Sequence, residues 1–250
     1  MTRFSGKVAL ITGGTSGMGL ATAHRLLAEG ARVVVTGRDR VRLDAAVASL
    51  GDRAFGVAGD AANLADLDTL ASTVHDRYGG LDVVFANAGV GAFQPFGDVT
   101  EAEFHRVVDI NLKAVFFTVQ KTLPLLSDGG SVVINASFAL HRGTPGTALY
   151  SAAKAAAHNL TRTLAAELAP RRIRVNSVSP GTIDTPAFRT EVSAEARASL
   201  AASIAAGRVG TAEEVAAVVA FLTSGEASYV NGQDILVDGG LVNSTPAPVL

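Results

Sequence analysis

The stretch Val8-Ala-Leu-Ile-Thr-Gly-Gly-Thr-Ser-Gly-Met-Gly19 decides the fold of this chain. Four apolar residues predict a short strand, which runs directly into a glycine-rich turn and then into a helical stretch. Glycines let the backbone turn sharply and approach a pyrophosphate, and the amino end of a helix offers free N–H groups. The spacing is Gly-x-x-x-Gly-x-Gly, which differs from the common Gly-x-Gly-x-x-Gly pattern and lacks the lysine of a P-loop. This arrangement favours phosphate binding over a purely structural turn.

Short β-branched runs alternate with longer Ala/Leu-rich stretches along the whole chain. The predicted strands are Val8–Thr12, Ala31–Thr36, Ala54–Ala58, Leu81–Ala86, Ser131–Asn135, Ile173–Val178 and Asp234–Val237. The predicted helices lie near residues 18–29, 40–50, 64–78, 101–126, 148–169 and 211–223. Several of the strands are nearly all apolar, as strands covered on both faces are. The alternation predicts an α/β fold with a doubly wound parallel sheet of about seven strands and helices on both faces.

No linker, repeat or low-complexity block divides the chain, so residues 1–250 are expected to form a single domain. The segment 184–210 breaks the alternation, because it leaves one strand, contains Pro186 and Ala-rich helical sequence, and returns late. A long excursion beyond the carboxyl end of a strand is where a lid over a site would lie. We therefore expect 184–210 to be a substrate lid.

Composition excludes several classes of function. The chain has 250 residues, a net charge of −2 and no cysteine, which argues against nucleic-acid binding, disulfides and thiolate chemistry. The segment Met1–Lys7 has no apolar signal core, and no apolar run approaches the roughly 18 residues of a membrane span. We expect a cytoplasmic protein without a membrane partner. No metal site is expected, because metal-ligand spacing is missing among His24, His75, His105, His141 and His158.

The end of the second strand should contact the ribose of a dinucleotide. An acidic residue there binds the hydroxyls of NAD, whereas a basic residue holds the 2′-phosphate of NADP. Gly37 occupies the position of the acid and Arg38 follows it, and the guanidinium suits a phosphate in charge and geometry. The sequence therefore favours NADP(H). Asp39 and Asp44 leave NAD(H) open, and Arg38 could also be a solvated residue at a helix start.

Tyr150 and Lys154 lie four residues apart in a predicted helix, so they share one face. An ammonium beside a phenol favours the phenolate, and a phenol whose reference pKa is about 10 can then exchange protons nearer neutral pH. Alone, this spacing could arise in any Ala-rich helix. In this chain it suggests an acid/base catalyst because further polar residues precede it.

Asn87-Ala-Gly89 closes the fourth strand, Asn111 lies within the stretch 101–126, and Ser137 follows the fifth strand. Together with the glycine-rich turn and the Tyr150/Lys154 pair, these motifs resemble the short-chain dehydrogenase/reductase family over essentially the whole chain. The segments 180–181 and 231–240 also look like family segments. One position departs from the pattern, since Ala86 stands where the family commonly has asparagine. The resemblance implies a Rossmann-like domain that binds NAD(P).

The resemblance also implies four catalytic residues. Tyr150 would protonate the carbonyl oxygen as hydride arrives, and Ser137 would hydrogen-bond the same oxygen. Lys154 would hold the nicotinamide ribose and lower the pKa of Tyr150, and Asn111 would help to anchor a water that links Lys154 to solvent. Each has a structural alternative: Ser137 could be a turn hydroxyl, and Asn111 could bend a helix by bonding its backbone.

By the same resemblance, Asp60 would bind the adenine, Asn87 would border the adenosine ribose, and Ile183 and Thr185 would meet the carboxamide. Asp60 could instead cap a helix. The expected cofactor-binding residues are Gly13, Thr15, Ser16, Gly17, Met18, Gly19, Arg38, Asp60, Ala61, Asn87, Ala88, Gly89, Tyr150, Lys154, Pro180, Gly181, Ile183 and Thr185. The family is usually tetrameric, so a homo-oligomer, tetramer or dimer, is expected.

The expected activity is that of a carbonyl reductase, an NAD(P)(H)-dependent oxidoreductase that interconverts a ketone and a secondary alcohol by hydride transfer. A 3-oxoacyl-thioester reductase and a sugar or polyol dehydrogenase are alternatives within the family. A dinucleotide-sensing regulator is the non-enzymatic alternative, although such a protein could lose the acid/base residues that this chain keeps. A serine hydrolase is disfavoured, because Ser137 has His141 nearby but lacks the Gly-x-Ser-x-Gly pattern.

Substrate contacts are expected from the loops 90–98, 138–147 and 184–207, which lie beyond strand ends. Their apolar residues are Phe93, Phe96, Phe138, Leu140, Pro145 and Phe188, and their polar exceptions are Gln94, His141 and Arg142. These residues predict a mostly apolar pocket for a medium-sized small-molecule ketone or alcohol. The same aromatic residues could instead pack the loops onto the domain.

Overall fold

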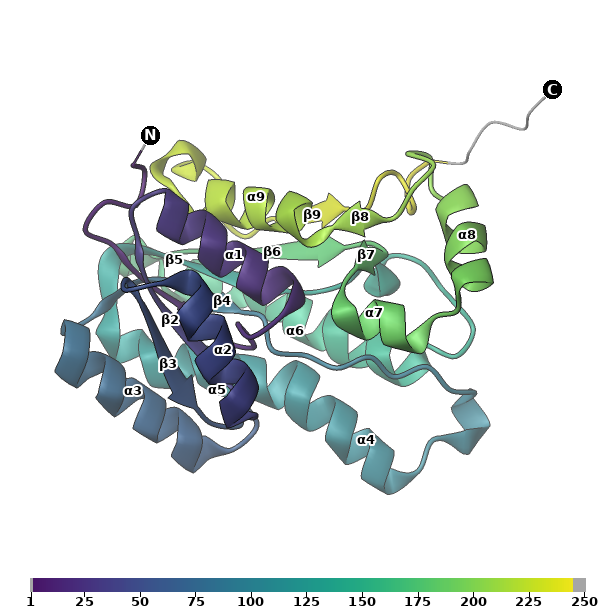
Figure 1. Ribbon diagram of the computed structural model, residues 1–250, viewed down its shortest axis with the longest axis horizontal. Helices are drawn as coiled ribbons and strands as arrows, with labels where there is room; N and C mark the ends of the chain where they lie inside the picture. The colour runs from purple at the N-terminus through teal and green to yellow at the C-terminus, as the bar shows by residue number, and fades with distance from the viewer. Residues whose placement is uncertain (1, 245–250) are drawn as a thin grey trace.

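The computed structural model describes residues 2–244, so residues 1 and 245–250 of the expected domain lie outside the described part. Seven parallel strands form one sheet in the order β3-β2-β1-β4-β5-β6-β9 (Figure 1). The strands are β1 (Val8–Ile11), β2 (Arg32–Gly37), β3 (Ala54–Ala58), β4 (Leu81–Ala86), β5 (Leu126–Asn135), β6 (Arg174–Pro180) and β9 (Asp234–Val237). The predicted Rossmann-like parallel sheet is confirmed.

Helices cover both faces of this sheet, and two apolar cores lie between them and the strands. One core holds buried side chains of α1 (Gly17–Ala28), α2 (Arg40–Leu50) and α9 (Ala212–Thr223). The other holds side chains of α3 (Leu64–Tyr78), α5 (Ala114–Thr122) and α6 (Ala148–Glu167). Helices on both faces explain why the strands are nearly all apolar. In β1, for example, every residue is buried. Within residues 2–244, no helix is both long and apolar enough to cross a membrane.

The strand order reverses between β1 and β4, and this reversal positions the site. β2 and β3 extend the sheet to one side of β1, whereas β4, β5, β6 and β9 extend it to the other. Connections that leave these two neighbouring strands in opposite directions open a crevice at their carboxyl ends, where ligands bind in such sheets. The glycine-rich turn follows β1 and Asn87 follows β4, so both line this crevice.

Two predicted elements have different boundaries in the structure. The helix expected over 101–126 is α4 (Glu101–Val108), a π-helical turn (Asp109–Lys113), α5 and a 3₁₀ turn (Leu123–Leu125). The strand expected over 131–135 begins at Leu126, with a register irregularity against β4 between Leu81 and Val83. A π turn adds one residue to a single helical turn, and in so short a stretch the apolar periodicity does not reveal it.

The segment 184–210 contains two short helices beyond the end of β6. They are α7 (Pro186–Glu191) and α8 (Ala194–Ala202), flanked by the two-residue strands β7 (Ile183–Asp184) and β8 (Gly210–Thr211) that pair with each other. Figure 1 shows α7 and α8 together at the right of the molecule, outside the main sheet. Thr185 caps α7, because its hydroxyl accepts the Phe188 N–H at 3.2 Å.

Candidate active site

The glycine-rich turn presents bare backbone to the crevice. Gly13 has a φ of +65°, and a Cβ at that position would lie 3.1 Å from the Ala88 Cα. A Cβ at Gly19 would lie 2.3 Å from the Gly13 carbonyl oxygen, so no other residue fits there. Ser16 precedes α1 without making a side-chain capping bond, which leaves the N–H groups of the first turn open to a ligand. This cradle suits a phosphate group.

Asn87 fastens the turn to β4. Its amide nitrogen donates to the carbonyl oxygens of Thr12 at 2.9 Å and Gly13 at 3.2 Å. The Thr12 hydroxyl in turn accepts the backbone N–H groups of Asn87 at 3.0 Å and Ala88 at 3.1 Å. The side chain expected to border the adenosine ribose is therefore bonded within the protein, where it sets the shape of the turn.

Asn135, at the end of β5, was not among the predicted site residues. Its amide nitrogen donates to Asn87 Oδ1 at 2.9 Å, and its backbone carbonyl accepts Lys154 Nζ at 2.8 Å. Asn135 is 5% exposed. A buried chain of hydrogen bonds thus runs from the Gly13 carbonyl through Asn87 and Asn135 to Lys154, and it joins the expected phosphate-binding turn to the expected catalytic lysine.

Ser137 and Tyr150 meet in front of this chain. Ser137 follows β5 and caps a 3₁₀ turn (Phe138–Leu140), and Tyr150 lies in the first turn of α6. Burial raises the pKa of Tyr150 above its ordinary value, and a hydrogen bond with the Ser137 hydroxyl acts in the opposite direction. The phenol is therefore held in its protonated form, with Ser137 as its partner.

Lys154 lies one turn beyond Tyr150 and is 3% exposed. Burial lowers the pKa of Lys154 to about 8. Its Nζ lies 5.9 Å from the centroid of the Tyr150 ring. Desolvation of the phenol is the largest influence on the pKa of Tyr150 and raises it in this structure, so the expected lowering of that pKa by Lys154 stays a prediction.

Asn111 lies on the π-helical turn and is completely buried. Its Oδ1 accepts the Val90 N–H at 3.2 Å, and its Nδ2 donates to the carbonyls of Val90 at 3.0 Å and Val107 at 3.1 Å. A Cβ at Gly89 would lie 2.9 Å from Asn111 Oδ1 and 3.2 Å from Lys154 Nζ. The structure therefore brings Asn111 and Lys154 together around the point where a Gly89 side chain would stand, and π turns are frequent at functional sites.

The ribose end of the crevice is formed by the ends of β2 and β3. Arg38 Nη1 lies 3.8 Å from Asp60 Oδ2, and both side chains are solvent-accessible. Asp39 instead caps α2 through the Arg42 N–H at 3.1 Å, and Asp44 pairs with Arg40. Ala61, another predicted cofactor residue, lies next to Asp60 in the turn after β3.

Gly37 packs against the turn. A Cβ at Gly37 would lie 2.4 Å from Thr15 Cγ2, so the absence of a side chain there lets Thr15 approach β2. Met18, in the first turn of α1, packs against the core beneath and does not project freely. Thr15, itself a predicted cofactor residue, thus fills the space that an acidic side chain at position 37 would need in order to bind NAD.

Thr185 links the lid segment to the glycine-rich turn. A Cβ at Gly17 would lie 3.2 Å from Thr185 Cγ2. Ile183 is buried, and Pro180-Gly181 ends β6 with Gly181 donating its N–H to the Val237 carbonyl at 3.0 Å. These residues lie on the side of the turn where the nicotinamide half of a dinucleotide is expected.

The substrate loops differ from one another in how they are held. His141 Nε2 is 2.7 Å from Asp234 Oδ2, and Arg142 Nη1 donates to the Leu241 carbonyl at 2.8 Å, so these two polar residues are already partnered. The Gln94 N–H donates to the Gly146 carbonyl at 2.9 Å and ties the first loop to the second. Phe93 is 66% exposed, with its ring centroid 5.9 Å from that of Tyr150.

Fold and site together are typical of a dinucleotide-binding α/β protein. A model of the family described as "Enoyl-(Acyl carrier protein) reductase" matches residues 13–242. Oxidoreductase asL5 of Sarocladium schorii is 41% identical over 241 residues, which cover 96% of this chain and 97% of that protein. The 3-oxoacyl-(acyl-carrier-protein) reductase FabG of Thermotoga maritima is 39% identical over 249 residues, which cover 96% and 99%.

Solved structures agree with these relatives. The short-chain dehydrogenase/reductase "SDR:Glucose/ribitol dehydrogenase" of Brucella melitensis has a TM-score of 0.93 and 37% identity, covering 97% of this chain and 99% of that one. A blue fluorescent protein from a metagenomic library, in complex with NADPH, has a TM-score of 0.90 and 33% identity, covering 96% and 99%. This chain belongs to the short-chain dehydrogenase/reductase family of NAD(P)(H)-dependent oxidoreductases.

Proposed function

We propose that this protein is an NADP(H)-dependent carbonyl reductase that interconverts a ketone and a secondary alcohol. The observation that carries the proposal is the convergence of Ser137, Tyr150 and Lys154 at the carboxyl edge of the sheet, beside the open glycine-rich turn. A dinucleotide sensor without catalysis would need none of these three groups.

Each of these side chains has a distinct task in ketone reduction. The bound cofactor supplies a hydride to the carbonyl carbon. Tyr150 donates its phenolic proton to the carbonyl oxygen, and the Ser137 hydroxyl hydrogen-bonds that oxygen as negative charge develops on it. Lys154, when charged, stabilises the phenolate that remains on Tyr150. Asn111 holds the loop around Gly89 in place next to Lys154, and we propose that it also helps to anchor a water leading to solvent.

The proposed preference for NADP(H) rests on Arg38 and on the ion pairs that the nearby aspartates already make. Arg38 follows β2 with an exposed side chain, and its ion pair with Asp60 is long at 3.8 Å, so the guanidinium can turn toward a 2′-phosphate. Asp39 and Asp44 are already paired with Arg42 and Arg40, so neither is placed to bind two ribose hydroxyls. The related blue fluorescent protein in complex with NADPH gives further support.

An apolar ketone is the proposed substrate. Phe93, next to Tyr150, offers an exposed aromatic wall, while His141 and Arg142 are bonded away from the Tyr150 hydroxyl. We propose that the segment 184–210 closes over this substrate. A 3-oxoacyl thioester is a second candidate, because FabG of Thermotoga maritima is a 3-oxoacyl-(acyl-carrier-protein) reductase of similar length.

A substrate panel tests the activity. Purified protein is mixed with NADPH or NADH and with aryl ketones, alkyl ketones, sugars and acyl thioesters, and the nicotinamide absorbance is followed. We expect the fastest oxidation of NADPH with ketones. Much faster turnover of sugars or thioesters would reject the apolar ketone, and cofactor binding without any turnover would favour a sensor.

Replacement of Tyr150 by Phe tests the catalytic assignment. Loss of the general acid should lower kcat by at least about 100-fold, because the phenylalanine ring keeps the packing but has no proton to donate. Titration of NADPH, followed by its fluorescence, should give a Kd close to that of the unaltered protein. Retained turnover in Tyr150→Phe would remove Tyr150 from the mechanism.

We further propose a cytoplasmic homo-oligomer, a tetramer or dimer. Exposed aromatic side chains on α4, α5 and α9, namely Phe104, Phe116 and Phe221, support subunit contacts through these helices. Light scattering after size exclusion measures the subunit number directly. A monomer at micromolar concentration would contradict the assembly, and a fluorescent fusion expressed in the source cells would show its location.

A further inference from the structure

A second pocket opens at the opposite edge of the sheet from the catalytic residues. It has a volume of about 720 Å³, within the range of small-molecule sites. Its walls come from the amino ends of β1, β4 and β6, from the first half of β5, and from the turn that follows α9. The catalytic groups lie at the carboxyl ends of these strands, so this pocket is separate from the cofactor crevice.

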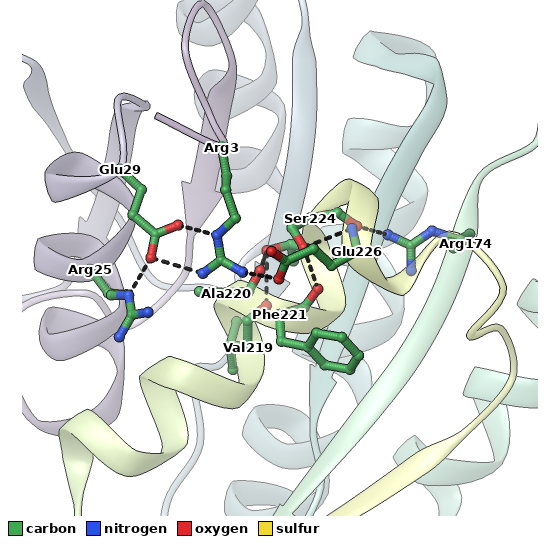
Figure 2. A network of polar contacts seen from close by, with 10 residues as sticks. Arg3, Arg25, Glu29, Arg174, Val219, Ala220, Phe221, Ser224 and Glu226 are labelled. Carbon is green, nitrogen blue, oxygen red and sulfur yellow. Dashed lines mark hydrogen bonds and ion pairs between the residues drawn. The ribbon is translucent and has the colours of Figure 1, made fainter. Parts of the chain in front are cut away.

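Basic residues outnumber acidic ones in its lining. Arg3, Lys7, Arg172 and Arg174 line the pocket, and Asp82 is its one acidic residue. Some of this charge is already neutralised. Arg3 donates to Glu29 at 2.5 and 2.8 Å and to Glu226 at 2.6 Å (Figure 2). Lys7 Nζ lies 2.8 Å from Asp82 Oδ1, and Asp82 Oδ2 also accepts the Val8 N–H.

Two of the arginines that line this pocket have no acidic partner among residues 2–244. Arg174 is partly buried and donates only to the carbonyl oxygens of Val230 at 3.2 Å and Ser224 at 3.0 Å; Figure 2 shows the second of these bonds. Burial lowers the pKa of Arg174, which reflects a charge removed from water without a counterion. The Arg172 side chain makes no hydrogen bond or ion pair with the described residues.

Arg172 also occupies an unusual backbone position. Its φ of +56° makes it the one non-glycine residue of positive φ in the described chain. Glycine adopts this conformation without strain, whereas a side chain there costs conformational energy. Arg172 thus places a positive charge at the pocket while its backbone has a conformation that glycine would adopt more easily. The Tyr229 ring, fully exposed at the pocket edge, adds a flat apolar surface beside the charges.

We propose that this pocket binds a small organic anion with two acidic groups, phosphate or carboxylate, through the guanidiniums of Arg172 and Arg174. The forked N–H groups of arginine match the oxygens of both acids in geometry. Two unpaired cations match a dianion in charge, and the pocket is large enough for a metabolite rather than a bare ion. The site is independent of the proposed reaction and of the cofactor.

Calorimetric titration tests the site with two probes, pyrophosphate for phosphate ligands and succinate for dicarboxylates. We expect at least one probe to bind the full-length protein at millimolar concentrations or below. The probe that binds identifies the acid group of the natural ligand. The variant Arg172→Gly removes one cation and relieves the positive φ, so it should fold as well as the parent while its Kd for the probe rises about tenfold.

Two controls complete the test. Arg32→Ala removes an exposed arginine at the same edge of the sheet that does not line the pocket, and it should leave the Kd unchanged. Saturating NADPH fills the glycine-rich turn, which could itself take pyrophosphate, and it should also leave the Kd of the probe unchanged. The proposal is overturned if neither probe binds, if Arg172→Gly binds as well as the parent, or if saturating NADPH abolishes binding. Thermal melting confirms that each variant is folded.

Discussion

In the proposed mechanism Lys154 carries the charge that stabilises the Tyr150 phenolate, and its pKa is lowered to about 8 by burial. Below about pH 8 the ammonium is present, and above it the charge is lost. We therefore expect kcat/KM for ketone reduction to fall as the pH rises through this value. A pH profile of kcat/KM in the free enzyme measures the break. In Lys154→Arg the side chain stays charged, so an unchanged break in that variant would assign it to another group.

Arg38 is the residue on which we expect the preference for NADPH over NADH to depend. Arg38→Ala should raise the Kd for NADPH by about tenfold or more and leave the Kd for NADH nearly unchanged, because only NADPH has a 2′-phosphate to pair with the guanidinium. Fluorescence titration with both nucleotides gives the two constants. Arg40→Ala is a matched control, since Arg40 is similarly exposed and also pairs with an aspartate, Asp44. Equal losses for both nucleotides would remove Arg38 from the phosphate site.

The sequence indicated the four proposed catalytic residues but not Asn135. Asn111, Ser137, Tyr150 and Lys154 stand in recognisable order along the chain, and the structure brings them to one edge of the sheet. Asn135 resembles any polar residue at a strand end, and its partners Asn87 and Lys154 are 48 and 19 residues away. Only the pairing of β4 with β5 and the packing of α6 place these three side chains together.

At the level of elements, α7 is the part of the proposed lid that one residue anchors. The Thr185 hydroxyl caps α7, and its methyl group lies 3.2 Å from where a Cβ on Gly17 would stand. Thr185→Val removes the cap but keeps the methyl, and it should cost about 1 kcal/mol of local stability. Hydrogen exchange across residues 186–191 should be several-fold faster in this variant. Thr185→Ser keeps the hydroxyl and should exchange like the parent; faster exchange there would mean that the methyl contact, not the cap, holds α7.

Hydrogen exchange also tests the lid itself. If the segment 184–210 closes over the site, NADPH together with a ketone analogue should slow exchange in α7 and α8. Exchange in α2, which lies beside the ribose end, gives the comparison for cofactor binding alone. Unchanged exchange throughout α7 and α8 with both ligands bound would argue that this segment is a fixed wall.

Element types were predictable along most of the chain, but boundaries were not. The apolar runs and their glycine-rich ends located all seven strands of the main sheet, since a parallel strand buried on both faces has few polar residues. The first residues of β5, Leu126-Ser-Asp-Gly-Gly130, contain turn-forming residues and do not look like a strand. Their pairing depends on β4, through Leu81, and therefore on tertiary structure.

At the scale of the whole molecule, a network of ion pairs joins the amino-terminal segment to α1 and to the turn after α9. Arg3 bonds Glu29 at the end of α1 and Glu226 after α9, and Arg25 also pairs with Glu29 (Figure 2). The Arg3 hydrogen bond is the largest cause that lowers the pKa of Glu29 from 4.5 to about 2. No sequence pattern indicates this network, because Arg3 and Glu226 are 223 residues apart.

This network predicts a pH dependence of stability. Because the folded-state pKa of Glu29 is lowered, its contribution is complete above the unfolded pKa and is lost as pH falls from about 4.5 to about 2. Measured by urea unfolding, the free energy of unfolding should fall on acidification by about 2 kcal/mol less in Glu29→Gln than in the parent. At pH 7 the parent should be the more stable of the two. Glu226 is 57% exposed at its side chain, so Glu226→Gln should change stability by less than about 1 kcal/mol. Identical acid profiles for Glu29→Gln and the parent would contradict this role.

The reversal of strand order between β1 and β4 bears on how such chains diversify. Strands β1, β2 and β3 carry the glycine-rich turn and Arg38, whereas Ser137, Tyr150 and Lys154 all come later in the chain. Recombination between related genes at Gly79-Gly80, the turn before β4, would exchange the nucleotide-reading half as one piece. The hybrid must keep the contacts between its halves, among them the pairing of β1 with β4, the contact of Thr12 with Asn87 and the packing of α1 on α9. We therefore expect that nucleotide preference and carbonyl chemistry can be inherited separately.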